Sequence, residues 1–562
     1  MAGTAYDAIV VGSGITGGWA AKELTEKGLR TLVLEAGRPI VPGQDYVEHV
    51  PAWELKYRGW DNREERLKTQ PIQRECYAVC DEYSHQFFVN DLENPYTTDP
   101  GKPFLWIRGR HVGGRSIMWG RQSYRWSDLD FEANLREGIA IDWPIRYKDI
   151  APWYDYVEDF VGVCGQMEGL PQLPDGKFLP PMEMNCAELT VKDAIAKHFA
   201  EDRIMTIGRA AILTQVHNGR APCHYCGPCH RGCITRSYFS SLNATLPAAE
   251  KTGRMTLRPH STVHSLIFDS AARKVTGVRV IDSQSRKAIE FQGRIIFLCA
   301  SALESTRILL NSATSEFPNG LANSSGELGH NLMDHVMGGG ADGRIPGHED
   351  KQVFGHRPNG IYVPRFRNVK SKQAKFVRGY GYQGGGGREG WTRGMTSVGI
   401  GADFKRSLRQ PGPWRFTFYG FGECLPNRDN YIEIDKGKND AWGVPALKIH
   451  CAFGDNEKAL LQDMSIQASE MLAAAGARDI QPFMENNAPG LTIHEMGTAR
   501  MGRDPKSSVL NEHNQAHDVK NLFVTDGACM TSSSCVNPSL TYMALTARAC
   551  DFAVSKMQRN EL

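Results

Sequence analysis

Apolar and polar residues alternate at the start of the chain in a way that predicts a strand–helix–strand unit. The run Ala8-Ile9-Val10-Val11 reads as a buried strand, and a glycine-rich turn follows it at once. Residues 19–27 then read as a helix. A second apolar run at 31–34 reads as another strand, which ends at Glu35. We expect an α/β domain to begin here.

Further along, the pattern changes twice. Apolar runs between residues 255 and 298 are separated by polar turns and predict short strands. Residues 302–311 read as a helix. From about 345 to 488 the chain is rich in glycine and aromatic residues with alternating stretches, which predicts an antiparallel sheet with one helix near 456–475.

The C-terminal segment returns to an α/β pattern. Residues 522–524 read as a strand and Asp526-Gly527 as a turn, followed by a helix over 538–557. Pro538 suits the first helical position, and Asn537 before it suits the cap.

Composition narrows the class of protein. The chain has 562 residues, of which 41% are hydrophobic and 23% charged, and these fractions exclude a disordered, collagen-like or coiled-coil chain. The chain has 65 Lys and Arg residues and 63 Asp and Glu residues, and this balanced charge does not indicate a nucleic-acid-binding protein. The chain has no run of 18 apolar residues, so we expect no transmembrane helix, and its first residues do not resemble a signal peptide.

The first glycine turn carries candidate chemistry. Gly12, Gly14 and Gly17 form G-x-G-x-x-G between the first strand and helix, and Glu35 ends the second strand. Gly12 allows the turn, Gly14 lets the backbone approach a pyrophosphate, and Gly17 lets helix and strand pack closely. Glu35 can accept hydrogen bonds from ribose hydroxyls. The motif predicts dinucleotide binding but does not choose between FAD and NAD.

A cysteine cluster is the second candidate site. Cys223, Cys226, Cys229 and Cys233 have the spacing C-x2-C-x2-C-x3-C, which is typical of iron–sulfur ligands. Zinc, a thioredoxin-like dithiol and a haem c attachment site within Cys226–His230 are alternatives. The dithiol lacks its βαβ context, and haem leaves Cys223 and Cys233 unexplained. An iron–sulfur cluster is the favoured interpretation.

Several separated motifs together resemble the glucose–methanol–choline (GMC) oxidoreductases, which are FAD-dependent. The motifs are the Gly12 turn with Glu35, the Gly113-Gly114 loop, residues 300–310, residues 494–502, and the run from Asp526-Gly527 to Asn537-Pro538. The resemblance covers most of the chain except about 160–240. It implies a Rossmann-like FAD domain assembled from separated segments, an antiparallel-sheet substrate domain and a Cys-rich insertion.

The resemblance also implies boundaries and roles. The FAD domain would comprise 1–160, 241–344 and 490–562, with the Cys-rich insertion at 161–240 and the substrate domain at 345–489. By its place before the Gly-Thr pair, His494 matches the family's catalytic base, and Asn537 matches its partner. Imidazole suits the role of base because it titrates near the working pH. From spacing alone, a structural histidine and a helix cap are the commoner readings of these two residues. The implied FAD-binding residues are Gly12, Gly14, Ile15, Thr16, Gly17, Glu35, Ala36, Arg110, Gly113, Gly114, Ser116, Val263, Ala300, Asp526, Gly527, Asn537 and Pro538.

One departure from the family pattern bears on how FAD is held. Some sugar-oxidising relatives bind FAD covalently through a histidine just before the tryptophan of the second glycine loop. Met118 stands at that position here, and a thioether cannot make the linkage. We therefore expect non-covalent FAD.

Within the family the chain looks most like the catalytic subunit of glucoside 3-dehydrogenases, which oxidise the C3 hydroxyl of glucosides and disaccharides. A related bacterial branch holds a three-iron cluster in a cysteine-rich insertion and passes electrons to a cytochrome c subunit. Its cysteine spacing differs, so both 3Fe-4S and 4Fe-4S stay open. The resemblance implies a small subunit with a twin-arginine signal and a periplasmic location, with a cytoplasmic one as the alternative.

Two rival functions remain at this point. One is a GMC oxidase that makes peroxide, with zinc at the cysteines; the other is a flavoprotein used for electron transfer or sensing. Other sugar or sugar-acid dehydrogenases acting at C1 or C2 are also open. Tyr380, Tyr382, Trp391 and Trp414 could stack on a pyranose, but core packing is the favoured reading for most of them.

Overall fold

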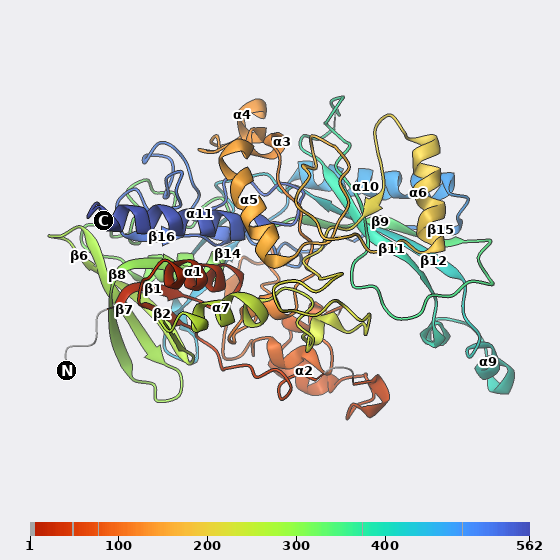
Figure 1. The fold of residues 1–562 in the computed structure, drawn as a ribbon, viewed down its shortest axis with the longest axis horizontal. Coiled ribbons are helices and arrows are strands. Elements are labelled where there is room, and N and C mark those ends of the chain that lie inside the picture. Colours follow the sequence, from red (N-terminus) through yellow and green to blue (C-terminus); the bar gives the residue numbers. More distant parts are fainter. Residues whose placement is uncertain (1–5, 48–49, 77, 374, 486) are drawn as a thin grey trace.

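The computed structural model describes residues 6–47, 50–76, 78–373, 375–485 and 487–562. Figure 1 shows two lobes side by side, one built on β1, β2 and β8 and the other on β9, β11 and β12. The predicted fold class, a Rossmann-like domain joined to an antiparallel-sheet domain, is confirmed by this architecture.

The first lobe is built on a mixed sheet with the order β5-β2-β1-β8-β7-β6, and β16 pairs with β8. Its strands β5, β2, β1, β8 and β16 run parallel, whereas β6 and β7 pair antiparallel. Their bounds are β1 Tyr6–Val11, β2 Thr31–Leu34, β5 Met255–Arg258, β6 Ser261–Asp269, β7 Lys274–Asp282, β8 Ala288–Leu298 and β16 Leu522–Val524. The central parallel strands are apolar on both faces, and both faces are buried: Ala8 and Val10 lie in one apolar cluster and Ile9 and Val11 in another.

Helices α1 (Ile15–Glu26) and α11 (Ser539–Gln558) pack together beside this sheet. Ala8 and Val10 of β1 share one buried cluster with Ala20 and Leu24 of α1. Small side chains on α1 let it lie close to the strands. The remaining helices of this lobe and its surroundings are α3 Asp128–Phe131, α4 Ala133–Glu137, α5 Tyr147–Val161, α7 Leu246–Lys251 and α8 Ala302–Asn311.

The second lobe is an antiparallel sheet with the order β15-β9-β12-β11-β10-β4. The bounds are β4 Thr206–Ile207, β9 Val336–Ile345, β10 Ile361–Val363, β11 Tyr380–Arg388, β12 Trp414–Gly422 and β15 Arg478–Met484. Helix α10 (Asp455–Ala474) packs against β9, as the single helix predicted near 456–475. Glycines at 385 and 386 of β11 admit α6 (Cys186–His198), since a Cβ at either position would meet an α6 side chain or its cap within 3.2 Å.

A third, small sheet joins β13 (Tyr431–Asn439), β14 (Pro445–His450) and β3 (Thr97–Thr98). Helix α9 (Gly401–Ser407) lies in the long connection between β11 and β12 and projects from the second lobe in Figure 1. Over the described ranges, no helix combines the length and apolar character that crossing a bilayer requires.

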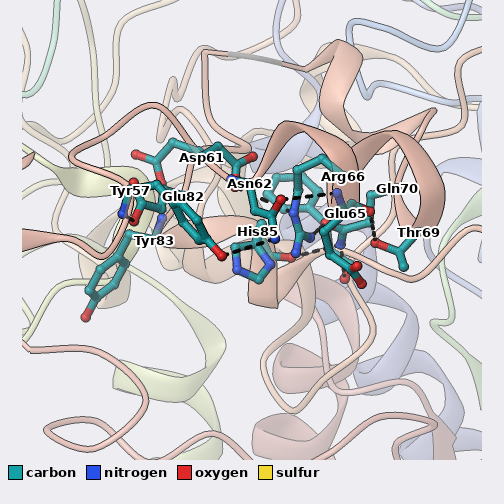
Figure 2. Close-up of polar contacts among 12 residues, drawn as sticks. Tyr57, Asp61, Asn62, Glu65, Arg66, Thr69, Gln70, Glu82, Tyr83 and His85 are labelled. Carbon is teal, nitrogen blue, oxygen red and sulfur yellow. Dashed lines mark hydrogen bonds and ion pairs between the residues drawn. The ribbon is translucent and has the colours of Figure 1, made fainter.

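The segment that contains α2 (Arg63–Thr69) is held by its own polar contacts, which Figure 2 shows. The carboxylate of Glu82 accepts from the backbone N–H groups of Tyr57 (2.6 Å) and Gly59 (2.7 Å). Asn62 caps α2 by accepting from the N–H of Glu65. Residues after α2, among them Cys76 and Val79, line the main cavity described below.

Most predicted elements coincide with observed ones. The strands at 31–34 and 522–524 and the helix at 302–311 have the predicted bounds. Helix α1 begins at Ile15 rather than at residue 19, because Gly17 and Gly18 already belong to the helix. The predicted cap at Asn537 is wrong: Pro538 is the cap residue of α11, and the Asn537 side chain takes another partner.

Candidate active site

A cavity of about 410 Å³ lies at the carboxyl ends of the parallel strands of the first sheet. Val11 of β1, Leu34 of β2 and Cys299 after β8 are among the residues that line it. Ligands of open α/β sheets bind at this edge, where helix N-termini and loops converge. The cavity is large enough for the bulk of a cofactor.

The glycine turn has the geometry that its sequence predicts. Gly12 has φ of +97°, and a Cβ there would stand 2.4 Å from the carbonyl oxygen of Cys299. A Cβ at Gly17 would stand 2.0 Å from the Gly12 carbonyl oxygen, so helix and turn touch only because glycine is present. A Cβ at Gly14 would meet nothing within 4 Å and would project into open space. Gly14 therefore leaves room for a ligand beside the start of α1.

Glu35 is tied into this turn. Its carboxylate accepts from the backbone N–H of Ser13 (3.1 Å), the hydroxyl of Ser13 (2.6 Å) and the N–H of Gly37 (2.9 Å). Burial raises the pKa of Glu35, and the three donors oppose that shift. The Ser13 hydroxyl also accepts from the N–H of Gly113 at 3.0 Å. One serine thus joins the first glycine turn to the second glycine loop.

The second glycine loop closes one wall of the cavity. Gly113 has φ of +89° and precedes a 3-10 turn over Gly114–Ile117. The hydroxyl of Ser241 donates to the carbonyl of Gly14 at 2.7 Å and lies 3.0 Å from the hydroxyl of Ser116. Met118 lines the same cavity. This is the residue that stands in place of the histidine that binds FAD covalently in some relatives. The adjacent-glycine motif therefore lies against the first turn, as a shared ligand site needs.

Most predicted cofactor residues surround this one cavity. Those lining it are Gly12, Gly14, Ile15, Thr16, Glu35, Ala36, Arg110, Gly114, Ser116, Val263, Ala300, Asp526, Gly527, Asn537 and Pro538. Gly17 and Gly113 do not line it; they hold the surrounding backbone. Arg110 Nε and the Tyr542 hydroxyl are buried without a hydrogen-bond partner among the described residues, and both residues line the cavity. Open space at Gly14 and these polar atoms fit a polar dinucleotide such as FAD.

His494 enters the cavity from a loop held by a single carboxylate. Asp334 accepts from the N–H groups of Gly490 (2.7 Å), Thr492 (3.3 Å) and His494 (3.1 Å), and from the Thr492 hydroxyl. Burial raises the pKa of Asp334 to about 6. Ile493, just before the histidine, has φ of +65°, an uncommon value for a β-branched residue. The contacts to Asp334 hold this strained turn in place.

The His494 ring meets a second histidine. His494 Nδ1 lies 3.0 Å from Nδ1 of His335, and the ring planes stand at 78°. The Nε2 of His335 lies 3.0 Å from the carbonyl oxygen of Ser533. Burial, together with the positive charge of Arg115, holds the pKa of His494 well below its usual value. The ring is therefore a neutral base at ordinary pH.

Asn537 lines the same cavity as His494, although 43 positions separate them in the chain. Its Oδ1 accepts a hydrogen bond of 2.6 Å from Nε2 of Gln383, which lies on β11 of the second lobe. The amide nitrogen of Asn537 is then left to donate. The fold thus brings both predicted catalytic residues to one cavity.

Sequence reasoning missed three residues of this site, namely Asp334, His335 and Gln383. Asp334 and His335 stand between the apolar Met333 and Val336, and both are almost wholly buried. An adjacent acid and histidine inside an apolar run is a signal that the sequence carried. Gln383 gave no such signal.

The aromatic residues suggested for sugar stacking do not line this cavity. Tyr380, Tyr382 and Trp414 are buried, and their polar atoms bond to Asp463, the Met464 carbonyl and the His348 carbonyl respectively. Trp391 is 65% exposed on the connection before α9. Core packing therefore accounts for the first three.

The four clustered cysteines line a second, small cavity together. All four are free thiols, and burial raises the pKa of Cys223 and of Cys229. Asp81 anchors the segment by bonding His230 (3.1 Å) and Arg231 (2.7 Å). Within the described part of the chain, however, no three His, Cys, Asp or Glu side chains are arranged so that they could hold a metal ion. The donor types fit an iron–sulfur cluster, whereas the side-chain arrangement does not present a formed site.

The two cavities are neighbours. Tyr238 lines the cysteine cavity, and its hydroxyl donates to the carbonyl of Ile117, which stands between two residues of the main cavity wall. Arg121 lines the main cavity, lies 5.0 Å from the centre of the Tyr238 ring and acts electrostatically on Cys229. A thin wall of side chains therefore separates the cysteines from the predicted cofactor site.

Comparison with known proteins places this geometry in context. Family models described as GMC oxidoreductase match residues 6–337 and 426–546. The 2-methyl-1,2-propanediol dehydrogenase of Mycolicibacterium austroafricanum is 29% identical over 97% of this chain and 94% of its own. The fructose dehydrogenase large subunit of Gluconobacter japonicus is 25% identical over 98% of both chains. The gluconate 2-dehydrogenase flavoprotein of Pantoea cypripedii is 24% identical over 96% of this chain and 92% of its own.

Solved structures agree on the fold. Pyridoxine 4-oxidase from Mesorbium loti superposes with a TM-score of 0.60 at 17% identity, covering 97% of this chain and 98% of that one. Formate oxidase of Aspergillus oryzae RIB40 gives a TM-score of 0.62 at 13% identity over the full length of both chains.

Proposed function

The chain belongs to the GMC oxidoreductase family, and on that premise we propose that it is a dehydrogenase that oxidises a secondary hydroxyl of a glucoside or disaccharide at C3. As a member of the family it is an FAD-dependent oxidoreductase acting on CH–OH groups. The proposal concerns the substrate, the oxidised carbon, the acceptor and the roles of individual residues.

The observation that carries the proposal is that His494 and Asn537 line the same cavity as the glycine turn. The neutral imidazole of His494 takes the proton of the substrate hydroxyl, and the amide of Asn537 donates a hydrogen bond to the same oxygen. FAD, when bound, supplies the acceptor for the hydride that leaves the substrate carbon. The C–H and O–H bonds break, a C=O bond forms, and the product is a 3-keto sugar.

Relatives support a sugar as the substrate. Two of them are named for fructose and gluconate and match almost the whole chain. A second candidate substrate is a small diol, because the 2-methyl-1,2-propanediol dehydrogenase is similar at 29% identity. Oxidation of a sugar or sugar acid at C1 or C2 and a peroxide-forming oxidase are further outcomes of the test below.

An iron–sulfur cluster, 3Fe-4S or 4Fe-4S, is proposed for Cys223, Cys226, Cys229 and Cys233. Their spacing and their shared cavity, one thin wall from the FAD site, support it. The observed side-chain arrangement, which is not that of a metal site, weighs against it. When bound, such a cluster supplies single-electron transfer from a two-electron cofactor to a one-electron acceptor. Iron and acid-labile sulfide in the purified protein, with absorbance near 400 nm, test this directly.

A cytochrome c acceptor and a small export subunit complete the proposal, with a periplasmic location. The relative from Gluconobacter is named as the large subunit of a dehydrogenase, which supports partner subunits. Apolar side chains at the surface beside the cysteines also support a partner. Phe354 is 91% exposed, two residues before His356, whose N–H donates to Tyr225 at 2.8 Å within the cysteine segment. Trp53 is 65% exposed, three residues after Val50, whose carbonyl accepts from Arg231 at 3.0 Å.

Anaerobic reduction of the bound flavin across a panel of glucosides, disaccharides, fructose, gluconate and small diols tests the substrate. We expect a glucoside or disaccharide to bleach the flavin fastest and NMR of the product to show a ketone at C3. Fastest bleaching by a diol favours the second candidate, and a lactone or 2-keto product moves the reaction to C1 or C2. Peroxide release under air favours an oxidase.

A further inference from the structure

Asp334 and His335 are adjacent in the chain and hold His494 from two sides. Asp334 holds the backbone, since its carboxylate accepts from the N–H of His494 at 3.1 Å. His335 holds the side chain, since the two Nδ1 atoms lie 3.0 Å apart. Both residues immediately precede β9 of the second lobe, at relative exposures of 1%. The pair therefore connects the base to the sheet of the second lobe.

The hydrogen-bond partners of His335 determine where its proton lies. The carbonyl oxygen of Ser533 only accepts, so the Nε2 of His335, 3.0 Å away, carries a hydrogen and donates to it. Burial lowers the pKa of His335 to about 4, so the ring is neutral and holds one proton. Its Nδ1 is consequently an acceptor with a free lone pair.

The protonation of His494 follows from that of His335. Two unprotonated nitrogens do not stabilise each other at 3.0 Å, so the Nδ1 of His494 carries a hydrogen and donates to the Nδ1 of His335. A neutral His494 then has no hydrogen on Nε2. The neighbouring charge of Arg115 does not change which nitrogen of His494 carries the hydrogen, because Arg115 is paired with Glu495 through two hydrogen bonds (3.1 and 2.9 Å).

We propose that Asp334 and His335 are positioning residues for the reaction, with His335 fixing the tautomer of His494 so that its Nε2 is the proton acceptor. This inference rests on the proposed role of His494. Ser533, whose carbonyl accepts the hydrogen bond from His335, lies four residues before Asn537. The hydrogen bonds from His494 through His335 to Ser533 therefore link the two segments that carry the catalytic candidates.

Paired substitutions of His335 separate this role from packing. In His335→Asn the side-chain oxygen takes the place of Nδ1 and still accepts from His494. In His335→Gln the amide nitrogen takes the place of Nε2 and still donates to Ser533, but no acceptor faces His494. We expect substrate to reduce the flavin of His335→Asn at a rate within about tenfold of the wild type. The rate of flavin reduction in His335→Gln should fall on the order of 10²-fold. In a His494→Ala background the two variants should be equal.

A readout other than activity uses ring-15N-labelled histidine in the oxidised holoenzyme. The resonances of His494, assigned by their loss in His494→Ala, should show a protonated Nδ1 and an unprotonated Nε2 in the wild type and in His335→Asn. Loss of that pattern in His335→Gln, with unchanged flavin content and melting temperature, is expected. Equal rates in the Asn and Gln variants, or a protonated Nε2 in the wild type, would overturn the inference. Failure of every substrate to bleach the wild-type flavin would instead overturn the proposed function.

Discussion

Gln383 donates a hydrogen bond of 2.6 Å from its Nε2 to the Oδ1 of Asn537. The bond crosses from β11 of the second lobe to the segment just before α11 of the first. It occupies the acceptor of the Asn537 amide and turns its N–H groups toward other partners. A residue of the antiparallel sheet thereby orients a catalytic candidate of the dinucleotide-binding lobe.

Removal of this bond should weaken catalysis modestly. A neutral hydrogen bond contributes about 1 kcal/mol, so we expect Gln383→Met to lower kcat/KM about fivefold. In an Asn537→Ala background the same substitution should have almost no further effect, because the amide that it orients is gone. Steady-state kinetics of the four proteins measure the coupling. Fully additive losses would show that Gln383 acts elsewhere.

The glycine turn predicts separate effects on binding and on folding. Gly14→Ala should fold normally, because a Cβ there meets no atom within 4 Å, yet weaken FAD binding roughly tenfold by occupying the space beside the helix N-terminus. Gly12→Ala should lower the melting temperature of the apoprotein itself, since φ is +97° and the Cβ would collide with the Cys299 carbonyl.

Gly390→Ala is the matched control, because that glycine also has open space around its Cβ position but lies before the α9 connection, away from the cavity. Fluorescence titration of apoprotein with FAD and thermal melting distinguish the three variants. Unchanged FAD affinity in Gly14→Ala would remove the turn from the cofactor site.

The lowered pKa of His494 sets the pH dependence of the chemical step. The base acts when neutral, and burial together with the positive charge of Arg115 keeps its pKa well below 6.5. The rate of anaerobic flavin reduction should therefore stay level as pH falls from 8 to 6.5 and decline only below that range. Stopped-flow reduction at saturating substrate measures this profile. A decline centred at or above pH 6.5 would show that another group titrates.

Loss of a clustered cysteine should affect the cofactor content rather than the hydride step. We expect Cys229→Ser to lose most of its iron and its electron transfer to an external one-electron acceptor, while substrate still bleaches the flavin. Cys186→Ser, on the first turn of α6 and outside the small cavity, should keep both properties. Iron analysis and dye-coupled assays compare them. Equal iron in both variants, or none in the wild type, contradicts the proposed cluster.

Local patterns were enough to predict much of the fold. The β2, α8 and β16 bounds came from short apolar runs and turn residues, which depend only on neighbours in the chain. Helix α1 starts four residues earlier than predicted because Gly17 and Gly18, poor helix formers alone, are packed there against the Gly12 carbonyl and against Thr245 respectively.

Long-range partners could not be predicted in the same way. His335 and His494 are separated by 159 positions, and Gln383 and Asn537 by 154, so no spacing rule connects them. Asn537 before Pro538 had the chemistry of a helix cap, but the tertiary contact with Gln383 took its side chain. The domain boundaries and the assigned roles of the site residues stay predictions.

The rate of anaerobic flavin reduction in wild-type protein and in His494→Gln tests the central claim most directly. Glutamine is similar in reach to histidine but cannot take the hydroxyl proton. We predict that a glucoside bleaches the wild-type flavin and that the variant, with equal FAD content, does so 10²- to 10⁴-fold more slowly. Equal rates in the two proteins would contradict the account.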